Sequence, residues 1–226
     1  MFRLRYFVLA LAVTLPLART SQAQEKKVEP AAGKWDKEFA AMEAKDKQAP
    51  PSKQGIVFVG SSSIRMWDLK ESFPDLPAIN RGFGGSQLSD SVEHFDRLVL
   101  PHQPRIVVLY AGDNDLAGGK KTPEQVTADF AAFQKKLRAA LPECKLIFIG
   151  VKPSVARAKL LDKQRETNGL VRKSCEADKL STFLDVEKPM QSADGQVRPD
   201  IFLKDGLHLN DAGYKIWNEL LLPLLR

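Results

Sequence analysis

Residues 105–115 read RIVVLYAGDND, an apolar run of strand length that ends in a polar turn. The run does not alternate polar with apolar residues, which is typical of a strand buried on both faces of a parallel sheet. Similar runs occupy residues 56–59, 78–80, 145–151 and 182–186. Because amphipathic stretches separate these five runs, the sequence predicts an α/β fold: a three-layer α/β/α sandwich around a five-stranded, doubly wound parallel sheet.

The clearest helix signal follows the third apolar run. Thr122 is a predicted N-cap, Pro123 occupies the first helical position and Gln125 the third, after which apolar residues recur in one stripe as far as Leu141. Other helices are expected after Gly85, over residues 160–178 and 211–222, and around the Trp35, Phe39 and Met42 stripe that precedes the first strand.

The beginning of the chain has the composition of an export signal. MFRLR is basic, residues 6–18 are largely apolar, and Ser21-Gln22-Ala23 places small residues around Gln22. We therefore expect a signal peptide over residues 1–23, a linker and helix over residues 24–54 and a catalytic domain over residues 55–226, in a secreted or periplasmic protein. A retained membrane anchor is the alternative, which Pro16 and Arg19 disfavour.

Charge and cysteine content exclude several classes of protein. Removal of a leader with three arginines would lower the formal net charge from +6 to +3, and the basic residues are scattered, so a nucleic-acid partner is not indicated. After signal cleavage no segment is apolar enough to span a membrane. Cys144 and Cys175 allow one disulfide but no zinc cluster, and no other close metal-ligand motif is present. The oligomeric state is left open.

Four polar turns occupy the positions where a doubly wound sheet binds its ligands, after the strands or near the end of the chain. Taken singly, each could be an ordinary helix cap, glycine turn or ion pair. The second turn lacks the glycine register of a dinucleotide loop, and no Gly-x-Ser-x-Gly elbow of the α/β-hydrolases is present. The four turns are Gly60-Ser61-Ser62-Ser63-Ile64, Asn80 to Gly85, Gly112 to Asp115, and Asp205 to His208.

Together these turns supply the parts of an acyl-transfer site: a hydroxyl nucleophile, an imidazole base, a carboxylate and hydrogen-bond donors for an oxyanion. Their order resembles the four signature blocks of the SGNH (GDSL-like) hydrolases, a family of lipases, acylhydrolases and esterases with a flavodoxin-like sheet. The resemblance covers residues 55–226. It implies a catalytic triad of Ser62, Asp205 and His208, with the Ser62 N–H, the Gly85 N–H and the Asn114 amide forming the oxyanion hole.

One position departs from the family pattern, because Ser61 stands where the first block usually has an aspartate. The register still favours Ser62 as nucleophile, with Ser61 and Ser63 as alternatives, because Trp67 falls where relatives often have an aromatic residue. The departure puts in question how this turn is braced. His94 and His102 lack a catalytic context and are interpreted as surface or packing residues.

The resemblance predicts a serine esterase that cleaves small carboxylic esters, acetyl or short-acyl, through an acyl-enzyme and without a cofactor or metal. Its substrate would be a small molecule or a glycan, with O-acetylated carbohydrates favoured by export. Residues 153–159 and 191–199 are expected to edge the pocket. Two alternatives use the same fold: a catalytically idle carbohydrate-binding domain, and an O-acyltransferase with the same triad.

Overall fold

The computed structural model describes residues 1–2 and 33–226 of the chain. Nearly all of the expected signal peptide and the polar segment after it therefore lie outside the described residues. Lys34–Arg226 form one compact unit. None of the helices in this part of the chain combines the length and apolar character needed to cross a bilayer.

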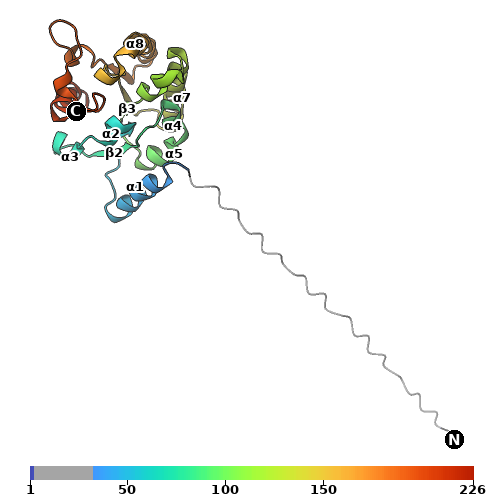
Figure 1. Ribbon diagram of the computed structural model, residues 1–226. Helices are drawn as coiled ribbons and strands as arrows, with labels where there is room; N and C mark the ends of the chain where they lie inside the picture. The colour runs from blue at the N-terminus through green and yellow to red at the C-terminus, as the bar shows by residue number, and fades with distance from the viewer. Residues whose placement is uncertain (3–32) are drawn as a thin grey trace. The chain divides into compact units, whose positions relative to one another are not determined.

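Five parallel strands form the central sheet, in the order β2-β1-β3-β4-β5. Figure 1 shows this sheet among the helices, with β2 and β3 labelled. The chain builds outward from β1 to β2, then crosses back to β3 and continues in the opposite direction. The switch point lies between β1 and β3, and ligands in such folds bind beyond the carboxyl ends of the strands there. The strands are β1 (Ile56–Gly60), β2 (Ala78–Gly82), β3 (Ile106–Tyr110), β4 (Lys145–Ile149) and β5 (Ser181–Leu184).

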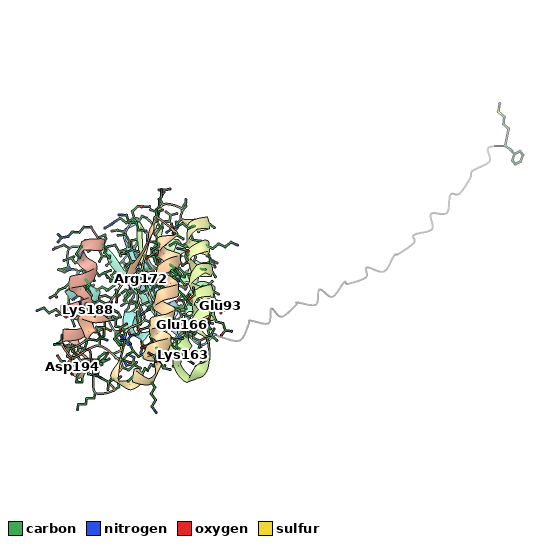
Figure 2. All side chains as sticks on the ribbon, turned by 90° about the horizontal axis from the view of Figure 1, so that it is seen from above. Glu93, Lys163, Glu166, Arg172, Lys188 and Asp194 are labelled. Atoms are coloured by element: carbon green, nitrogen blue, oxygen red, sulfur yellow. The ribbon has the colours of Figure 1, made fainter. Side chains whose placement is uncertain are left out.

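Both faces of the sheet are covered, which confirms the predicted three-layer architecture. Along β1, Val57 and Val59 pack into one apolar cluster while Ile56 and Phe58 pack into the other. Figure 2 shows the sheet between helices on its two sides, with Lys163, Glu166 and Arg172 spaced along one of them. The first cluster is covered by α1 (Asp36–Gln48), α4 (Leu88–Glu93), α5 (Phe95–Leu98), α7 (Pro123–Ala140) and α8 (Leu161–Glu176), and the second by α3 (Leu69–Ser72) and α9 (Asp211–Leu221).

The predicted capping of α7 is present in the structure. The Gln125 N–H donates to Thr122 Oγ1 at 3.3 Å, and the Thr122 N–H donates to Gln125 Oε1 at 2.9 Å. This reciprocal pair satisfies two N–H groups at the helix start that have no acceptor within the helix. The predicted stripe from Val126 to Leu137 is buried against the sheet.

The helix expected after Gly85 is divided in two, because the backbone of His94 leaves helical geometry (φ −92°, ψ 11°) between α4 and α5. Two further one-turn helices follow strands directly: α2 (Ser62–Arg65) after β1 and α6 (Asp113–Leu116) after β3. Short 3-10 helices cover Leu100–His102, Ala117–Gly119, Val155–Leu160, Lys188–Met190, Pro199–Ile201 and Leu222–Leu224.

Helix α1 is joined to the sheet layer by apolar and polar contacts. Phe39 is buried and packs edge-to-face on Phe83. Trp35 Nε1 donates to the Gly84 carbonyl at 3.0 Å. Asp46 accepts two hydrogen bonds from Arg81, at 2.5 and 2.6 Å. The leading helix therefore braces the loop that follows β2.

Cys144 and Cys175 are both buried, and both are free thiols. Each belongs to the apolar cluster on the α7–α8 side of the sheet. Burial raises the pKa of Cys144 to about 11 and that of Cys175 to about 12. The disulfide that the sequence allowed is absent from this structure, and the two residues serve as apolar packing groups.

Candidate active site

The turn after β1 presents Ser62 at the first position of α2. Gly60 has φ +137°, and a Cβ at this position would overlap the Tyr110 carbonyl, so the close approach of β1 to β3 requires glycine. The Ser61 N–H donates to the same carbonyl at 3.0 Å. The chain therefore leaves the sheet sharply, and Ser62 follows directly.

Ser62 is the serine that meets the predicted base. Its hydroxyl lies 2.9 Å from His208 Nε2, and His208 Nδ1 lies 2.6 Å from Asp205 Oδ2. Ser61 and Ser63 are each only 3% exposed, whereas Ser62 is partly exposed. Ser62, His208 and Asp205 thus form one chain of hydrogen bonds, although Ser62 and His208 are 146 positions apart in the sequence.

Asp205 is held in place by the turn in which it lies. Its Oδ1 accepts the Leu207 and His208 N–H groups at 2.9 and 3.0 Å, which leaves Oδ2 for the imidazole. The hydrogen bond from His208, followed by those two N–H groups, lowers the pKa of Asp205 to about 2. An ionised Asp205 favours a proton on Nδ1, so Nε2 carries the lone pair that faces Ser62.

Asn80 and the backbone brace the nucleophile turn, which answers the question raised by Ser61. Asn80 Nδ2 donates to the Ile64 and Trp67 carbonyls at 2.6 and 3.0 Å, and its Oδ1 accepts the Gly82 N–H at 2.8 Å. The Ser61 carbonyl accepts N–H groups of the following helical turn, while its side chain makes no capping bond. The departure from the family pattern therefore leaves the turn supported.

Two backbone N–H groups at this edge of the sheet are available to a ligand. Ser62 begins a helix, so its N–H has no intrahelical acceptor. Gly85 follows β2 in the left-handed region at φ +70°. Among the residues that the structure describes, neither N–H donates a hydrogen bond to another protein group. Both can therefore donate to an oxyanion.

Asn114 follows β3, and its side chain reaches across to the loop after β2. Its Nδ2 donates to the Ser86 carbonyl at 2.9 Å, and its Oδ1 accepts from Arg157 Nη2 at 2.9 Å. One of the two Nδ2 hydrogens is used by Ser86, so the second remains to serve a ligand. The structure therefore places all three predicted oxyanion-hole donors beyond the carboxyl ends of β1, β2 and β3.

The residues after β4 add a charged cluster that the sequence interpretation did not assign to the site. Asp113 lies 2.7 Å from Arg157 Nη1 and 3.1 Å from Lys152 Nζ. Burial alone would raise the pKa of Asp113, but the positive charges of Lys152 and Arg157 hold that pKa below its usual value. Their position in the sequence could have identified Lys152 and Arg157, because both follow a strand, as the other site residues do. The sequence interpretation expected residues 153–159 only to edge the pocket.

Asp115, the last residue of the third turn, is structural. Its carboxylate is fully buried, accepts the Leu88 N–H at 3.1 Å and lies 3.0 Å from Lys121 Nζ. It therefore ties the start of α4 to the loop after β3.

The two other histidines take part in packing, with His102 buried and His94 half-buried. His94 makes edge-to-face contacts with Trp35 and Phe39. His102 accepts a hydrogen bond from Arg81 Nε at 3.2 Å, and burial, followed by the charge of Arg81, lowers the pKa of His102 to about 4. His102 is therefore neutral at physiological pH, and both residues fulfil the predicted packing role.

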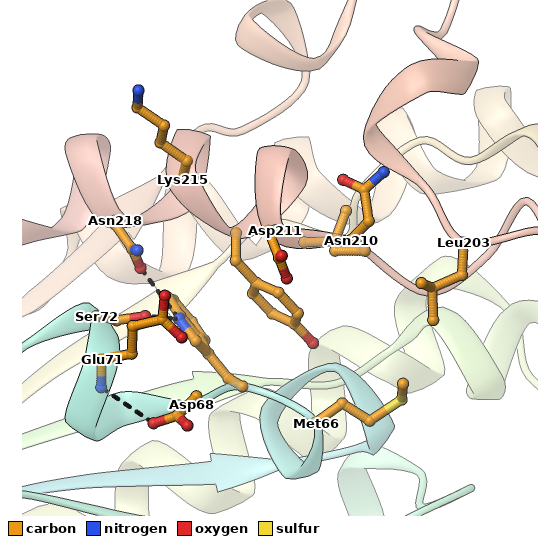
Figure 3. Close-up of a pocket in the computed structure, with 12 residues that line it drawn as sticks. Met66, Asp68, Glu71, Ser72, Leu203, Asn210, Asp211, Lys215 and Asn218 are labelled. Carbon is orange, nitrogen blue, oxygen red and sulfur yellow. Dashed lines mark hydrogen bonds between the residues drawn. The ribbon is translucent and has the colours of Figure 1, made fainter.

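A cavity of about 480 Å³ is lined in part by residues of α3 and α9 (Figure 3). Met66 and Leu203 are at one end of it, while Asn218 lies toward the other and accepts a hydrogen bond from Trp67 Nε1 at 3.0 Å. The triad residues do not line this cavity. Within residues 33–226, no three His, Cys, Asp or Glu side chains are arranged to hold a metal ion.

Comparison with characterised sequences finds relatives of similar length. The platelet-activating factor acetylhydrolase IB subunit alpha1 of Rattus norvegicus is 29% identical over 206 residues, covering 85% of this chain and 84% of that protein. The Homo sapiens subunit of the same name is also 29% identical and covers 85% of both chains.

Solved structures share the fold at lower identity. A GDSL-like lipase from Bacteroides thetaiotaomicron superposes with a TM-score of 0.69 at 21% identity, covering 83% of this chain and 96% of that one. A catalytic mutant of an acetylxylan esterase from Geobacillus stearothermophilus gives 0.62 at 14% identity, covering 77% and 95%. The sequence model of the GDSL-like Lipase/Acylhydrolase family matches residues 62–216, from the Ser62 turn into α9 and across His208. The chain therefore belongs to the GDSL-like lipase/acylhydrolase family, the SGNH hydrolases that its four polar turns predicted.

Proposed function

We propose that the protein is a serine esterase that hydrolyses short-acyl carboxylic esters through an acyl-enzyme. In the first step Ser62 Oγ attacks the ester carbonyl while His208 Nε2 takes its proton. The new C–O bond forms as the carbonyl π pair moves onto oxygen, which accepts hydrogen bonds from the Ser62 and Gly85 N–H groups and from Asn114 Nδ2.

Collapse of this intermediate breaks the bond to the alcohol. The protonated His208 gives its proton to the departing oxygen, which leaves an ester on Ser62. Water then attacks the acyl carbon, with His208 as the base, and the acid leaves as Ser62 regains its proton. Asp205 stays ionised throughout, stabilises the imidazolium and keeps the imidazole oriented.

The chain of hydrogen bonds from Asp205 through His208 to Ser62 is the observation that carries this proposal. Distances of 2.6 and 2.9 Å are those of a formed nucleophile–base pair with an oriented base. An idle carbohydrate-binding domain has no need of this constellation. The intact triad and the two unoccupied N–H donors favour the enzyme over that alternative.

Exposed apolar side chains near the triad support an ester with an apolar part. Met66, Val155 and Leu203 are 41, 47 and 42% exposed, and they are the only large exposed hydrophobic residues within residues 33–226. The Met66 N–H donates to the Ser62 carbonyl, and the Leu203 N–H donates to the His208 carbonyl. Val155 lies against Gly206, which stands between Asp205 and His208 in the sequence. An apolar rim of these three residues suits an acyl group or the apolar part of an alcohol.

A short acyl group is proposed because two relatives are named for acetyl esters: an acetylhydrolase among the sequences and an acetylxylan esterase among the structures. We place O-acetylated carbohydrates first among the substrates. The same triad could transfer the acyl group to a sugar alcohol in place of water, and the assay below separates the two reactions.

The test uses the purified protein with nitrophenyl acetate, butyrate and octanoate and with acetylated xylo-oligosaccharides. The wild type should release acetate and lose activity as the nitrophenyl acyl chain lengthens. Ser62→Ala should abolish turnover, while Ser63→Ala, which alters a buried hydroxyl of the same turn, should retain it at an equal thermal midpoint. An active Ser62→Ala enzyme would refute the proposed nucleophile.

Two further readouts separate the alternatives. Rapid quenching should show a mass increase of one acyl group on the peptide containing Ser62, and free xylo-oligosaccharide should not divert the acetyl group from water. Efficient acetylation of the added sugar would identify a transferase. Binding of the sugar without release of acetate from any ester would identify a binding domain.

A further inference from the structure

The side-chain amide of Asn114 is held from both ends. Its nitrogen donates to the Ser86 carbonyl and its oxygen accepts from Arg157, each at 2.9 Å. A flipped amide would point its N–H groups at a guanidinium and its oxygen at a carbonyl, so both contacts would become repulsive. Ser86 and Arg157 together therefore permit one orientation, in which the second Nδ2 hydrogen stays free.

Arg157 is itself fixed by a buried carboxylate. Asp113 lies 2.7 Å from Arg157 Nη1, and the two side chains are only 6 and 16% exposed. Lys152, which is 1% exposed, approaches the other oxygen of Asp113 at 3.1 Å. Tyr110 and Gln164 also donate to this carboxylate, each at 3.4 Å. The guanidinium therefore has little freedom to leave Asn114.

The charges in this cluster do not cancel. Arg157 and Lys152 carry two positive charges, and Asp113 supplies one negative charge. Burial of an uncompensated positive charge opposes folding, so stability alone does not account for this cluster. Arg157 donates to the oxygen of the Asn114 amide, whose nitrogen would donate to the oxygen that becomes negative in the proposed reaction.

We propose that Arg157 is a positioning residue for ester hydrolysis: it locks and polarises the Asn114 amide so that Nδ2–H points at the developing oxyanion. This inference rests on the proposed esterase function and adds a residue to it that lies outside the four turns. Arg157 acts through Asn114, so it should raise kcat without contributing to binding of the ground-state ester.

The size of the effect follows from the value of one oriented donor. Removal of an oxyanion-hole donor lowers kcat by about 10² to 10³, and loss of its orientation should forfeit a large part of that factor. Arg157→Met should therefore lower kcat on nitrophenyl acetate about 10- to 100-fold with KM within about twofold. Arg157→Lys keeps the charge but lacks the forked guanidinium that reaches Asn114 and Asp113 together. Its kcat should therefore lie between those of the wild type and Arg157→Met.

A matched control is present in the chain. Arg165 forms an ion pair of 2.7 Å with Glu187 and is half exposed, so Arg165→Met makes the same chemical change outside the site. It should leave kcat unchanged. Thermal melts and circular dichroism should show that Arg157→Met folds, because Lys152 still neutralises Asp113 after the substitution.

A double-mutant cycle with Asn114→Ala provides the decisive measurement. If Arg157 acts through Asn114, Arg157→Met should change kcat by less than about threefold in the Asn114→Ala enzyme. An equal loss in both backgrounds would overturn the inference and assign Arg157 an independent role. A rise in KM at unchanged kcat would also overturn it, because the contact would then be with bound substrate.

The two proposals fail in distinguishable ways. If Ser62→Ala abolishes turnover and Asn114→Ala lowers kcat while Arg157→Met does not, positioning is wrong and the esterase proposal stands. If Asn114→Ala itself keeps the wild-type kcat, then the oxyanion role of Asn114 and the positioning role of Arg157 are both refuted.

Discussion

Replacement of Asn114 by aspartate tests the oxyanion hole most directly. The substitution keeps the size of the side chain and an acceptor for Arg157, but it removes the N–H that donates to the Ser86 carbonyl and the N–H that remains free. A residue that only capped a turn would tolerate the exchange, because aspartate caps as well as asparagine. An oxyanion donor would not.

The expected magnitude has two parts. Loss of one donor costs about 2.7–4 kcal/mol of transition-state stabilisation, or 10² to 10³ in kcat. A carboxylate about 4 Å from the oxyanion adds repulsion of about 4 kcal/mol at an effective dielectric constant of ~20, which the neighbouring Arg157 partly offsets. Asn114→Asp should therefore have a kcat at or below that of Asn114→Ala, with KM changed far less.

The assay compares wild type, Asn114→Ala and Asn114→Asp on nitrophenyl acetate after thermal melts. Asn168→Asp is the matched control, because the Asn168 amide is also held by backbone groups, accepting the Val151 N–H at 2.7 Å and donating to the Val151 carbonyl at 2.9 Å. This control should lose stability and keep kcat within about threefold. An Asn114→Asp enzyme with near wild-type kcat would remove Asn114 from the mechanism.

Five further outcomes are expected. Because the pKa of Asp205 is lowered to about 2, its carboxylate stays ionised under assay conditions, so protonation of Asp205 should not contribute to any loss of kcat/KM above about pH 4; a two-proton slope above that pH would contradict this. The stability that Asp205 adds is present above its unfolded pKa and lost as pH falls toward 2, which acid-dependent melts would detect. Cys144 and Cys175 should resist thiol reagents in the native protein and titrate as two thiols after unfolding without reductant; finding none would show a disulfide. Exported protein should begin at or near Gln24 by N-terminal sequencing, and a retained leader would refute the proposed cleavage. Asp115→Ala, which leaves the buried Leu88 N–H without its acceptor while Lys121 keeps Asp129 at 2.6 Å, should destabilise the fold by about 1–3 kcal/mol in denaturant titrations, and an unchanged free energy of unfolding would contradict its structural role.

Local patterns were enough to predict the elements and the neighbourhood of the site. Runs such as residues 106–110 lack polar alternation, which is typical of strands buried on both faces, and the capping residues Thr122 and Gln125 marked the start of α7. Parallel strands all end at one edge, so polar turns far apart in sequence were expected to meet. The resemblance of these turns to the four family blocks then selected Ser62, Asn114 and His208, and the structure brings Ser62 and His208 into contact.

Other features depend on contacts that no local pattern encodes. The orientation of the Asn114 amide is set by Arg157, which comes 43 residues later in the sequence, after β4. Arg157 is in turn held by Asp113, which is buried between Arg157 and Lys152. The docking of α1 onto the loop after β2 depends on Trp35 reaching Gly84. Cysteine content allowed a disulfide, yet the structure buries both thiols unpaired.

The sequence by itself therefore determined the layered sheet and the edge at which the polar turns meet, and its resemblance to the family named Ser62, His208 and Asp205 as the proposed nucleophile, base and carboxylate. Hydrophobic periodicity and capping act between residues within a few positions of one another. The common direction of the strands then brings the turns that follow them to one edge of the sheet. Only the tertiary structure decided how the Asn114 amide is oriented and which charged groups lie next to it. Hydrogen-bond direction and Coulomb energy depend on distances of a few ångströms between groups on different elements, and those distances exist only after the chain has folded.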